Sequence, residues 1–408
     1  MRRALTSCIA VGAAAATASL ALAAPHHDDL PTERGARAVH DPAPRLVVAD
    51  GVVGKVAVVD LARRKVLTRL RIAEPASLWP VGDGRHVLAG QSNANRVDVI
   101  DAGSWSVEHG DHQHHYIRPP RKRAPILGPT PIHLVEHGDR FAVFTDGDGV
   151  GTVQTHANVG RGAKGARRVA SGAPHHGVAV PFGTRTLVSL PDPAGGSPIG
   201  VGVAGPRGAI VQRFEQCPGL HGEAAVGRNT VLFACADGYL AVTLRGSRIT
   251  AAKTAAVSDG AGLRRSSTLS SADGLPYAIG NLGNRAFVRV TPAGGPANVI
   301  ELDVDHGAFA LDGASRSLLT VTVDGQLTQI DPVSGAVTAR VPVAQPYSLA
   351  GAFSIPRPQI ALGPERRAYV SDPASGRVTE VATNPLRVTR TIAVGGVPRS
   401  LAVLGGGR

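Results

Sequence analysis

AYVSDPASGRVTEV at residues 368–381 and TIAVGGVPRSLAVL at residues 391–404 decide the fold of this chain. In both stretches, short runs rich in Val, Thr, Ile and Leu are separated by Gly, Pro, Asp and Ser. Such runs predict short antiparallel strands that are joined by tight turns. From about residue 45 onward, the chain has no stretch with a sustained helical period of apolar residues. We therefore expect an all-β protein.

The run VTEVA at 378–382 has counterparts along the chain at intervals of roughly 40 to 54 residues. The series is VAVVD (56–60), VDVID (97–101), GTVQT (151–155), VGVAG (201–205), LAVTL (240–244), FVRVT (287–291), LTQID (327–331) and VTEVA (378–382). A repeat of about 45 residues with several strands in each unit is typical of a β-propeller. We predict a β-propeller of eight blades, with seven as the alternative.

Each repeat should begin with an inner strand that lines a central channel. The expected starts are Ser77, Ile132, His176, His221, Ser267, His306, Gln359 and Ser400. The last run, SLAVL at 400–404, has no hairpin after it. We expect this C-terminal strand to close the first blade by pairing with LVVAD at 46–50, because closure covers edges that would otherwise stay unpaired. The final unit also resembles the repeats of secreted YVTN-type propellers.

The N-terminus has the pattern of a secretory signal. Met1-Arg2-Arg3 is basic, residues 9–24 are apolar, and Ala21-Leu22-Ala23 is an A-x-A cleavage site. This pattern predicts a signal peptide over 1–23, since the apolar run is short and Ala-rich for a membrane span; an uncleaved anchor is the alternative. We expect a flexible His-containing arm over 24–44 and a single propeller domain over 45–408. The mature protein should be secreted or periplasmic, with no membrane insertion.

Cleavage after Ala23 would remove Cys8 and leave Cys217 and Cys235. An even pair of cysteines in an oxidising compartment predicts a disulfide. In the chain-entropy model such a bridge contributes about 3 kcal/mol. The alternative, a metal site with two cysteine ligands, is disfavoured because oxidation competes with ligation.

The composition narrows the classes of function. With 43 Lys and Arg against 31 Asp and Glu, the formal charge is +12, which favours acidic partners. The basic patch at 118–123 has no interleaved aromatic residues, so we expect no nucleic-acid partner. The chain has no G-x-S-x-G, Walker or dinucleotide-binding motif. Fifteen His beside one Met suit zinc better than copper(I).

Histidines recur where the predicted inner strands begin. They are His133, His175, His176, His221 and His306. Equivalent ends of inner strands meet at one mouth of a propeller, so these imidazoles can form a zinc site there. Glu223, two residues beyond His221, is a further ligand candidate or a catalytic base. The alternative is that each histidine forms a hydrogen bond between blades.

A second group is local: His109, Asp111, His112, His114 and His115. His112 and His114 would place both rings on one side of an extended backbone. We predict a metal-binding loop, which would add to the histidine ring if it folds toward the channel; a solvated polar loop is the alternative.

Two further segments carry candidate ligands. His26 and His27 in the arm are candidate ligands of a zinc-capturing tether, or part of a disordered tail. Asp146-Gly147-Asp148-Gly149 lacks the rest of a calcium loop and predicts a turn.

HGDHQHHY at 109–116, PHHGVAV at 174–180 and CPGLHGEAA at 217–225 occur in this order. With these motifs, nearly the whole mature chain resembles the AztD-type secreted zinc metallochaperones, propeller proteins that accompany zinc ABC transporters. The resemblance implies a monomer that stores Zn²⁺ and passes it by ligand exchange to the transporter's solute-binding protein. His109, Asp111, His112 and His114 match the family's His/Asp loop, and His176 and His221 match its strand-entry histidines.

Two other classes of function stay open. One is a metal-dependent secreted hydrolase or lyase, similar to YVTN-type lactonases, with Glu223 as general base. The other is a purely structural propeller that docks proteins on its rim.

Overall fold

The described part of the chain is almost entirely β-structure. The structure is a computed structural model that describes residues 33–259, 262–295 and 297–406. Met1–Ala36 and Arg37–Arg408 form two separate units. In the first unit, the Ala36 N–H donates to the Glu33 carbonyl at 2.8 Å. The predicted signal peptide over 1–23, with His26 and His27, lies outside the described residues.

The second unit consists mainly of antiparallel sheets of four strands each. In the order of the chain, the first of these sheets are β38-β2-β3-β4 (Pro398–Leu404, Arg45–Asp50, Lys55–Asp60, Lys65–Arg71), β5-β6-β7 with β10 and β11 (Ser77–Pro80, His86–Gln91, Arg96–Asp101, Arg121–Lys122, Ile126–Leu127), β12-β13-β14-β15 (Pro131–His137, Arg140–Thr145, Val150–Thr155, Arg167–Ala170) and β16-β17-β18-β19 (Ala179–Phe182, Arg185–Leu190, Gly200–Ala204, Ile210–Phe214).

The remaining sheets continue the same pattern toward the C-terminus. They are β20-β21-β22-β23 (Glu223–Ala225, Thr230–Cys235, Gly238–Arg245, Arg248–Ala255), β26-β27-β28-β29 (Leu269–Ser271, Ala278–Leu282, Ala286–Val290, Asn298–Glu301), β30-β31-β32-β33 (His306–Asp312, Ser317–Thr322, Gln326–Ile330, Val337–Pro342) and β34-β35-β36-β37 (Ile360–Gly363, Arg367–Asp372, Arg377–Thr383, Leu386–Ala393), with a small hairpin β24-β25 (Val257–Asp259, Gly262–Arg264).

The repeated runs of the sequence fall on the third strand of each sheet, which confirms the all-β prediction. Most residues of the third strand β3 are buried on both faces, whereas the outermost strand β4 alternates exposed and half-buried residues. A third strand is covered by neighbouring sheets on both sides, so it reads as a continuous apolar run. The C-terminal strand β38 pairs with β2 from Arg45↔Leu404 to Asp50↔Pro398.

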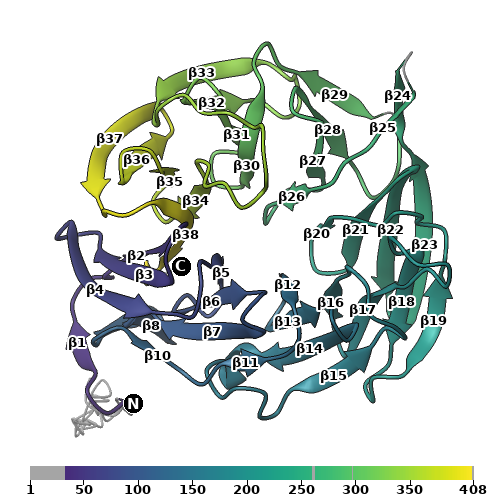
Figure 1. Ribbon diagram of the computed structural model, residues 1–408, viewed down its shortest axis with the longest axis horizontal. Coiled ribbons are helices and arrows are strands. Elements are labelled where there is room, and N and C mark those ends of the chain that lie inside the picture. The colour runs from purple at the N-terminus through teal and green to yellow at the C-terminus, as the bar shows by residue number, and fades with distance from the viewer. Residues whose placement is uncertain (1–32, 260–261, 296, 407–408) are drawn as a thin grey trace, which may run out of the picture. The chain divides into compact units, whose positions relative to one another are not determined.

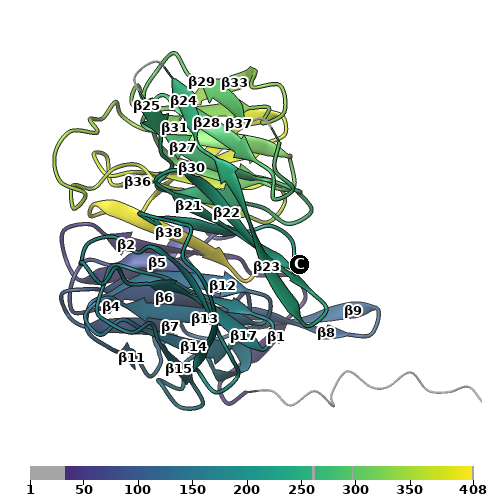
Figure 2. The ribbon, with the colours of Figure 1, turned by 90° about the vertical axis from the view of Figure 1, so that its right-hand side faces the viewer.

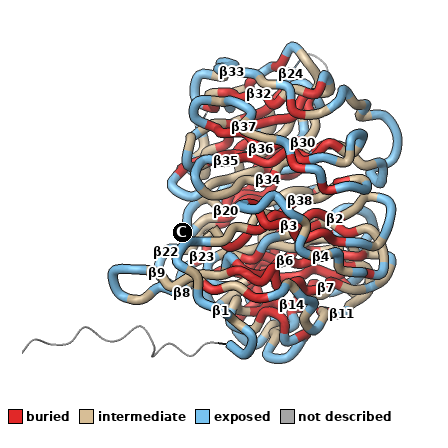
Figure 3. Tube along the Cα trace, turned by 90° about the vertical axis from the view of Figure 1, so that its left-hand side faces the viewer, coloured by how far each residue is buried: buried red, intermediate tan, exposed pale blue. Residues whose placement is uncertain are grey.

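The apolar core lies between the sheets. Each buried cluster joins residues of two neighbouring sheets; Phe287 of β28, for example, belongs to one cluster with Leu318 of β31 and Ile330 of β32. Another cluster joins β2 and β3 to β35 and β36, through residues such as Val48 and Tyr369. Figure 3 shows this buried interior in red, with exposed turns around it. The sheets therefore stabilise one another face to face.

The sheets of the second unit follow one another around a common centre, as in a β-propeller (Figure 1). Innermost strands of neighbouring sheets contact each other, as β12 does with β16 and β20 with β26. In every such sheet, the start of the first strand, the turn between the second and third strands and the end of the fourth strand lie at the same end. We call it the entry end.

A separate hairpin leaves the second sheet at the opposite end. β8 (Ser104–His109) and β9 (His112–Ile117) follow β7, whose last residues point away from the entry end, and they project beyond the sheets (Figures 2 and 3). β1 (Arg37–Val39) pairs with β9 as a third strand. Residues 37–39, predicted to belong to the flexible arm, are thus a paired strand.

The predicted disulfide is present. Cys217 and Cys235 are joined, and both are buried. The bridge ties the segment just before His221 to the end of β21. Within the described residues, no helix is long and apolar enough to cross a membrane.

Candidate metal centres

Three histidines from three consecutive sheets meet at the entry end. His133 lies on β12, and His176 and His221 lie just before β16 and β20. One ring nitrogen from each falls within 4.8 Å of the other two. The ring centroids are 4.7 Å apart for His133 and His176, and 5.3 Å apart for His176 and His221. We call these three residues the entry triad.

Each ring of the entry triad is held through its Nδ1 atom. The Nδ1 of His133 donates to the Gly177 carbonyl at 2.7 Å, and the Nδ1 of His221 donates to the Ser267 carbonyl at 2.8 Å. A carbonyl oxygen only accepts, so each Nδ1 carries a proton, and in the neutral form of either ring the lone pair is on Nε2. These bonds run between sheets, so the alternative of hydrogen bonds between sheets is observed for both residues, and Nε2 is left as the candidate ligand atom of each ring.

His176 is held by a carboxylate. Its Nδ1 lies 2.6 Å from Oδ2 of Asp146, in the turn between β13 and β14. A carboxylate bound to Nδ1 orients an imidazole ligand and makes its Nε2 more basic. Sequence reasoning placed Asp146 in a turn, which is correct, but missed its contact with a histidine thirty residues away. No local signal could have revealed it, because the contact exists only once the two sheets are packed.

Glycine follows His176 and His221 for steric reasons. A Cβ at Gly177 would collide with the Ser189 hydroxyl and the His175 ring. Gly222 has φ +89°, and a Cβ there would stand 2.8 Å from the Ser267 carbonyl oxygen that anchors His221. Any larger residue would push the backbone away from these anchors.

The environment sets the proton affinity of the entry triad. Burial lowers the pKa of His133, so its ring is neutral and ready to ligate. The hydrogen bond with Asp146 raises the pKa of His176 against the effect of burial. Burial also raises the pKa of Glu223, the first residue of β20, to about 7. The charge of His176 partly opposes this rise in the pKa of Glu223.

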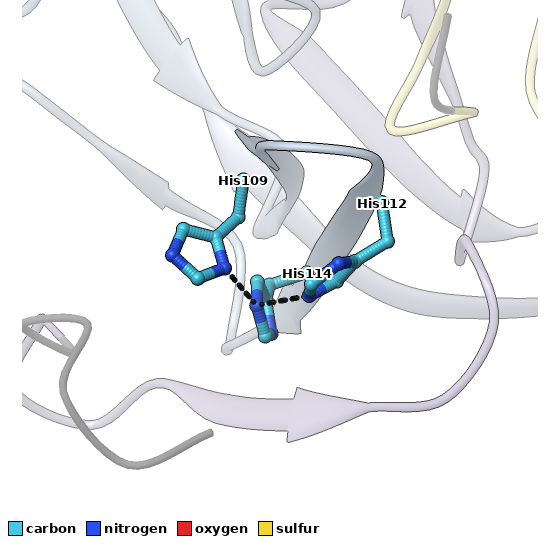
Figure 4. Close-up of side chains that lie close together, drawn as sticks. All are labelled: His109, His112 and His114. Atoms are coloured by element: carbon cyan, nitrogen blue, oxygen red, sulfur yellow. Dashed lines mark hydrogen bonds between the residues drawn. The ribbon is translucent and has the colours of Figure 1, made fainter. Parts of the chain in front are cut away.

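A second group of histidines lies on the projecting hairpin, at its turn. His112 Nε2 is 3.0 Å from His114 Nε2, which is 3.3 Å from His109 Nδ1 (Figure 4). Tetrahedral zinc with Zn–N distances of ~2.0–2.1 Å separates its ligand nitrogens by about 3.3 Å. The spacing of this hairpin group therefore already fits one ion. Asp111 Oδ1 accepts from His112 Nδ1 at 2.9 Å, and this hydrogen bond lowers the pKa of Asp111.

Strand periodicity explains which side chains belong to the hairpin group. His109 pairs with His112 across the turn at Gly110-Asp111, and His114 is two residues farther along β9. These three rings share one face. His115 points to the other face, where its Nδ1 lies 2.8 Å from the Ser106 hydroxyl. The expected loop is therefore a two-stranded hairpin with a two-residue turn.

The hairpin does not fold toward the channel mouth, so the condition under which it would add to the histidine ring is not met. It follows β7, a third strand, and third strands end opposite the entry end. Trp105 at its base lies under the Arg85 guanidinium, 3.8 Å from the ring centroid, and stacks on Tyr116. The two histidine groups are thus separate sites.

Two other candidates do not join either group. His175 has both ring nitrogens engaged, with the Ala173 carbonyl at 2.9 Å and the Ser189 hydroxyl at 2.7 Å. His306 is buried, and its ring centroid is 4.0 Å from that of Phe287 in the neighbouring sheet. His306 begins β30, and the sheet of β26 lies between its sheet and that of β20. His306 therefore starts an inner strand as the triad histidines do, but its ring does not join the triad.

The fold and the two sites define an all-β, propeller-like protein whose described residues include two histidine clusters suited to a metal ion. No family model matches the chain. The chain is 32% identical over 373 residues to the zinc chaperone AztD of Citrobacter koseri, which covers 89% of this chain and 86% of that protein. The chain belongs to the family of this chaperone.

Solved structures agree. The crystal structure of Citrobacter koseri AztD matches with a TM-score of 0.83 at 31% identity, over 90% of this chain and 99% of that one. Dihydro-heme d1 dehydrogenase NirN matches with a TM-score of 0.60 at 14% identity, over 92% of this chain and 78% of that one. The second likeness shows the fold alone. The family member is named as a chaperone, not as an enzyme.

Proposed function

We propose that this chain is an extracytoplasmic zinc metallochaperone, which stores Zn²⁺ and transfers it by ligand exchange to the solute-binding protein of a zinc ABC transporter. The observation that carries the proposal is the entry triad. Its Nε2 atoms converge while every Nδ1 is anchored by the protein. Membership of the AztD family supports zinc as the cargo.

The entry triad is the storage site in this proposal. Zinc takes four ligands, so three imidazoles would leave one position open for an incoming group. Glu223, two residues beyond His221 at the start of β20, is the protein's own candidate for the fourth ligand. A partner ligand then displaces the protein ligands one at a time, so no free ion is released. Asp146 holds His176 in place during the exchange.

The hairpin group is a second, more accessible zinc site. The side chain of His112 is 44% exposed and that of Asp111 is 99% exposed, so an incoming ion meets this group without entering the channel. Its separation from the entry triad argues for independent binding. His26, His27, His115, His175 and His306 are not assigned to either site.

We also infer the organisation of the whole protein. The pairing of β38 with β2, and the core cluster that joins the last sheet to the first, support a propeller of eight blades closed by its C-terminal strand. A cleavable signal peptide over 1–23, an arm that ends before β1 at Arg37 and a monomeric secreted or periplasmic protein complete the proposal. We assign it no membrane insertion and no nucleic-acid partner.

Zinc titration of single variants tests the two sites. His176→Gln should remove one bound zinc, and His114→Gln should remove the other. His175→Gln and His115→Gln are matched controls, since each changes a neighbouring imidazole outside the groups, and both should keep two zinc ions per chain. The proposal is wrong if His176→Gln binds zinc like the parent protein.

A second experiment separates the chaperone from a metal-dependent hydrolase. Zinc-loaded protein and the zinc-free solute-binding protein of the same organism's transporter are mixed, and zinc arrival is followed with and without a chelator in excess. Direct transfer survives the chelator, whereas release into solution does not. Hydrolysis of lactones that Glu223→Gln abolishes while zinc still binds would instead favour the enzyme.

A further inference from the structure

The connection from β33 to β34 presents apolar side chains to solvent at the entry end. Phe353 is 94% exposed and Ile355 is 47% exposed. Figure 1 shows this yellow-green segment running inward from the outer strand to the inner one. It is not loosely tethered: the Arg357 guanidinium donates to the Ser348 carbonyl at 3.1 Å and to the Leu349 carbonyl at 2.9 Å.

A neighbouring turn adds to the same surface. Val52 and Val53, between β2 and β3, are 63% and 43% exposed. Asp50 holds this turn by accepting both valine N–H groups, at 2.8 and 3.0 Å. The turn touches the β33–β34 connection, because a Cβ added at Gly51 would stand 2.6 Å from Pro356 Cγ. We call Val52, Val53, Phe353 and Ile355 the apolar rim.

Two residues of the apolar rim, Phe353 and Ile355, line a cavity that also includes an anchor of the entry triad. The cavity has a volume of about 410 Å³, and Phe353 and Ile355 line it together with Ser267 and Asn281. Ser267 is the residue whose carbonyl anchors His221. The cavity lining thus includes His306 and the residue that anchors His221, although no histidine of the triad itself lines the cavity.

The charge of the cavity is positive. Arg357 and Arg399 line it, and its lining includes no Asp or Glu among the described residues. Among the described residues, no carboxylate is paired with the guanidinium of Arg357 or of Arg399. Both groups donate hydrogen bonds to backbone carbonyls. Two unpaired cations beside exposed aromatic and aliphatic groups favour an occupant that carries carboxylates and an apolar side chain.

We propose that the apolar rim and this cavity form the docking surface for the protein that accepts zinc from the entry triad, and that the acceptor inserts a segment with an apolar side chain flanked by carboxylates. The inference rests on the proposed function. The hydrogen bonds of Arg357 already hold the backbone of this connection, which lowers the ordering cost of docking. Arg399 steers the acidic segment, and docking places the acceptor's own ligand beside His221. Ligand exchange then starts without opening the fold.

The test uses full-length zinc-loaded protein and the zinc-free solute-binding protein of the same organism's zinc ABC transporter. The variant is Phe353→Asp combined with Ile355→Asp. Val333→Asp is the matched control, since Val333 is 59% exposed in a turn at the opposite end of its sheet. We expect the double variant to slow transfer and weaken acceptor binding by about tenfold or more, as loss of a central apolar contact does. Its zinc affinity should stay within about twofold of the parent value.

A charge variant gives a second readout. Arg399→Glu should slow transfer most at low salt and flatten the dependence of the rate on ionic strength, because steering between exposed charges is screened by salt. The docking proposal is overturned if the double variant binds the acceptor and transfers zinc as fast as the Val333→Asp control. It is overturned equally if the double variant changes only self-association in sedimentation, which would assign the surface to a second copy of this chain.

Failure of the docking proposal can be told from failure of the proposed function. If the parent protein binds zinc at the entry triad but the double variant behaves like the control, only the docking surface is wrong. If His176→Gln leaves zinc binding intact, the proposed function is wrong, and acceptor binding still decides whether the apolar rim is an interface.

Discussion

Asp146→Asn is the substitution that most directly tests how the entry triad works. Asp146 Oδ2 lies 2.6 Å from His176 Nδ1, and its side chain is only 15% exposed. Asparagine keeps the size and a hydrogen-bonding oxygen but removes the negative charge. The change therefore removes charge support for His176 without leaving a cavity.

The magnitude follows from the distances. A zinc ion on His176 Nε2 would stand roughly 6 to 7 Å from the Asp146 carboxylate, given a Zn–N distance of ~2.0–2.1 Å. A charge of −1 and a charge of +2 at about 6.5 Å attract by about 1.3 kcal/mol even at the dielectric constant of water. That energy is close to tenfold in affinity. It also agrees with the roughly 10- to 100-fold cost of removing the partner of a ligating histidine.

The assay is competition with a chromophoric chelator at the same pH, near 8, for both proteins, above the ordinary imidazole pKa of about 6.5 so that competition from protons is small. We expect the zinc dissociation constant of the entry triad to rise about tenfold or more in Asp146→Asn. Asp148→Asn is the control, because Asp148 belongs to the same turn but bonds to Thr145 and Arg168. Equal dissociation constants for the two variants would refute the carboxylate's role.

Three further outcomes are expected. Replacing Cys217 and Cys235 together by Ser should lower the free energy of unfolding by about 3 kcal/mol, measured by urea titration. Zinc affinity should fall between about pH 7.5 and about pH 5.5, because protons compete for imidazole nitrogens; a flat calorimetric profile would contradict histidine ligation. Burial opposes ionisation of Glu380, but hydrogen bonds from Thr389 and Arg390 outweigh it and lower its pKa. The stability it supplies is present above its ordinary pKa and lost as pH falls, so Glu380→Gln should flatten the acid limb of thermal unfolding.

The repeat pattern of the chain predicted the strands well. The expected inner-strand starts at Ser77 and His306 are observed, and those at His176 and His221 lie two or three residues before β16 and β20. Runs buried on both faces have a clear sequence signal, because most residues in them are apolar or small. The predicted cysteine pair also formed, since only two cysteines remain after the predicted signal peptide.

The candidate sites were only partly predictable. The H-x-H spacing at 112–114 placed two rings on one face, but the third member, His109, comes from the paired strand. His115 was grouped with these histidines because the face of a strand on which a side chain lies is known only once the strand and its turn are known. The direction of the hairpin depended on which end of the sheet β7 leaves.

By itself, the sequence determined an all-β repeat fold, a disulfide, and histidines at the starts of inner strands. These features are local, because hydrophobic alternation and residue chemistry specify them within one repeat. The tertiary structure alone decided that His133, His176 and His221 meet while His306 packs in the core, and that Asp146 supports His176. Those outcomes depend on which sheets are neighbours, and contact between sheets is a property of the packed fold that no single stretch of residues contains.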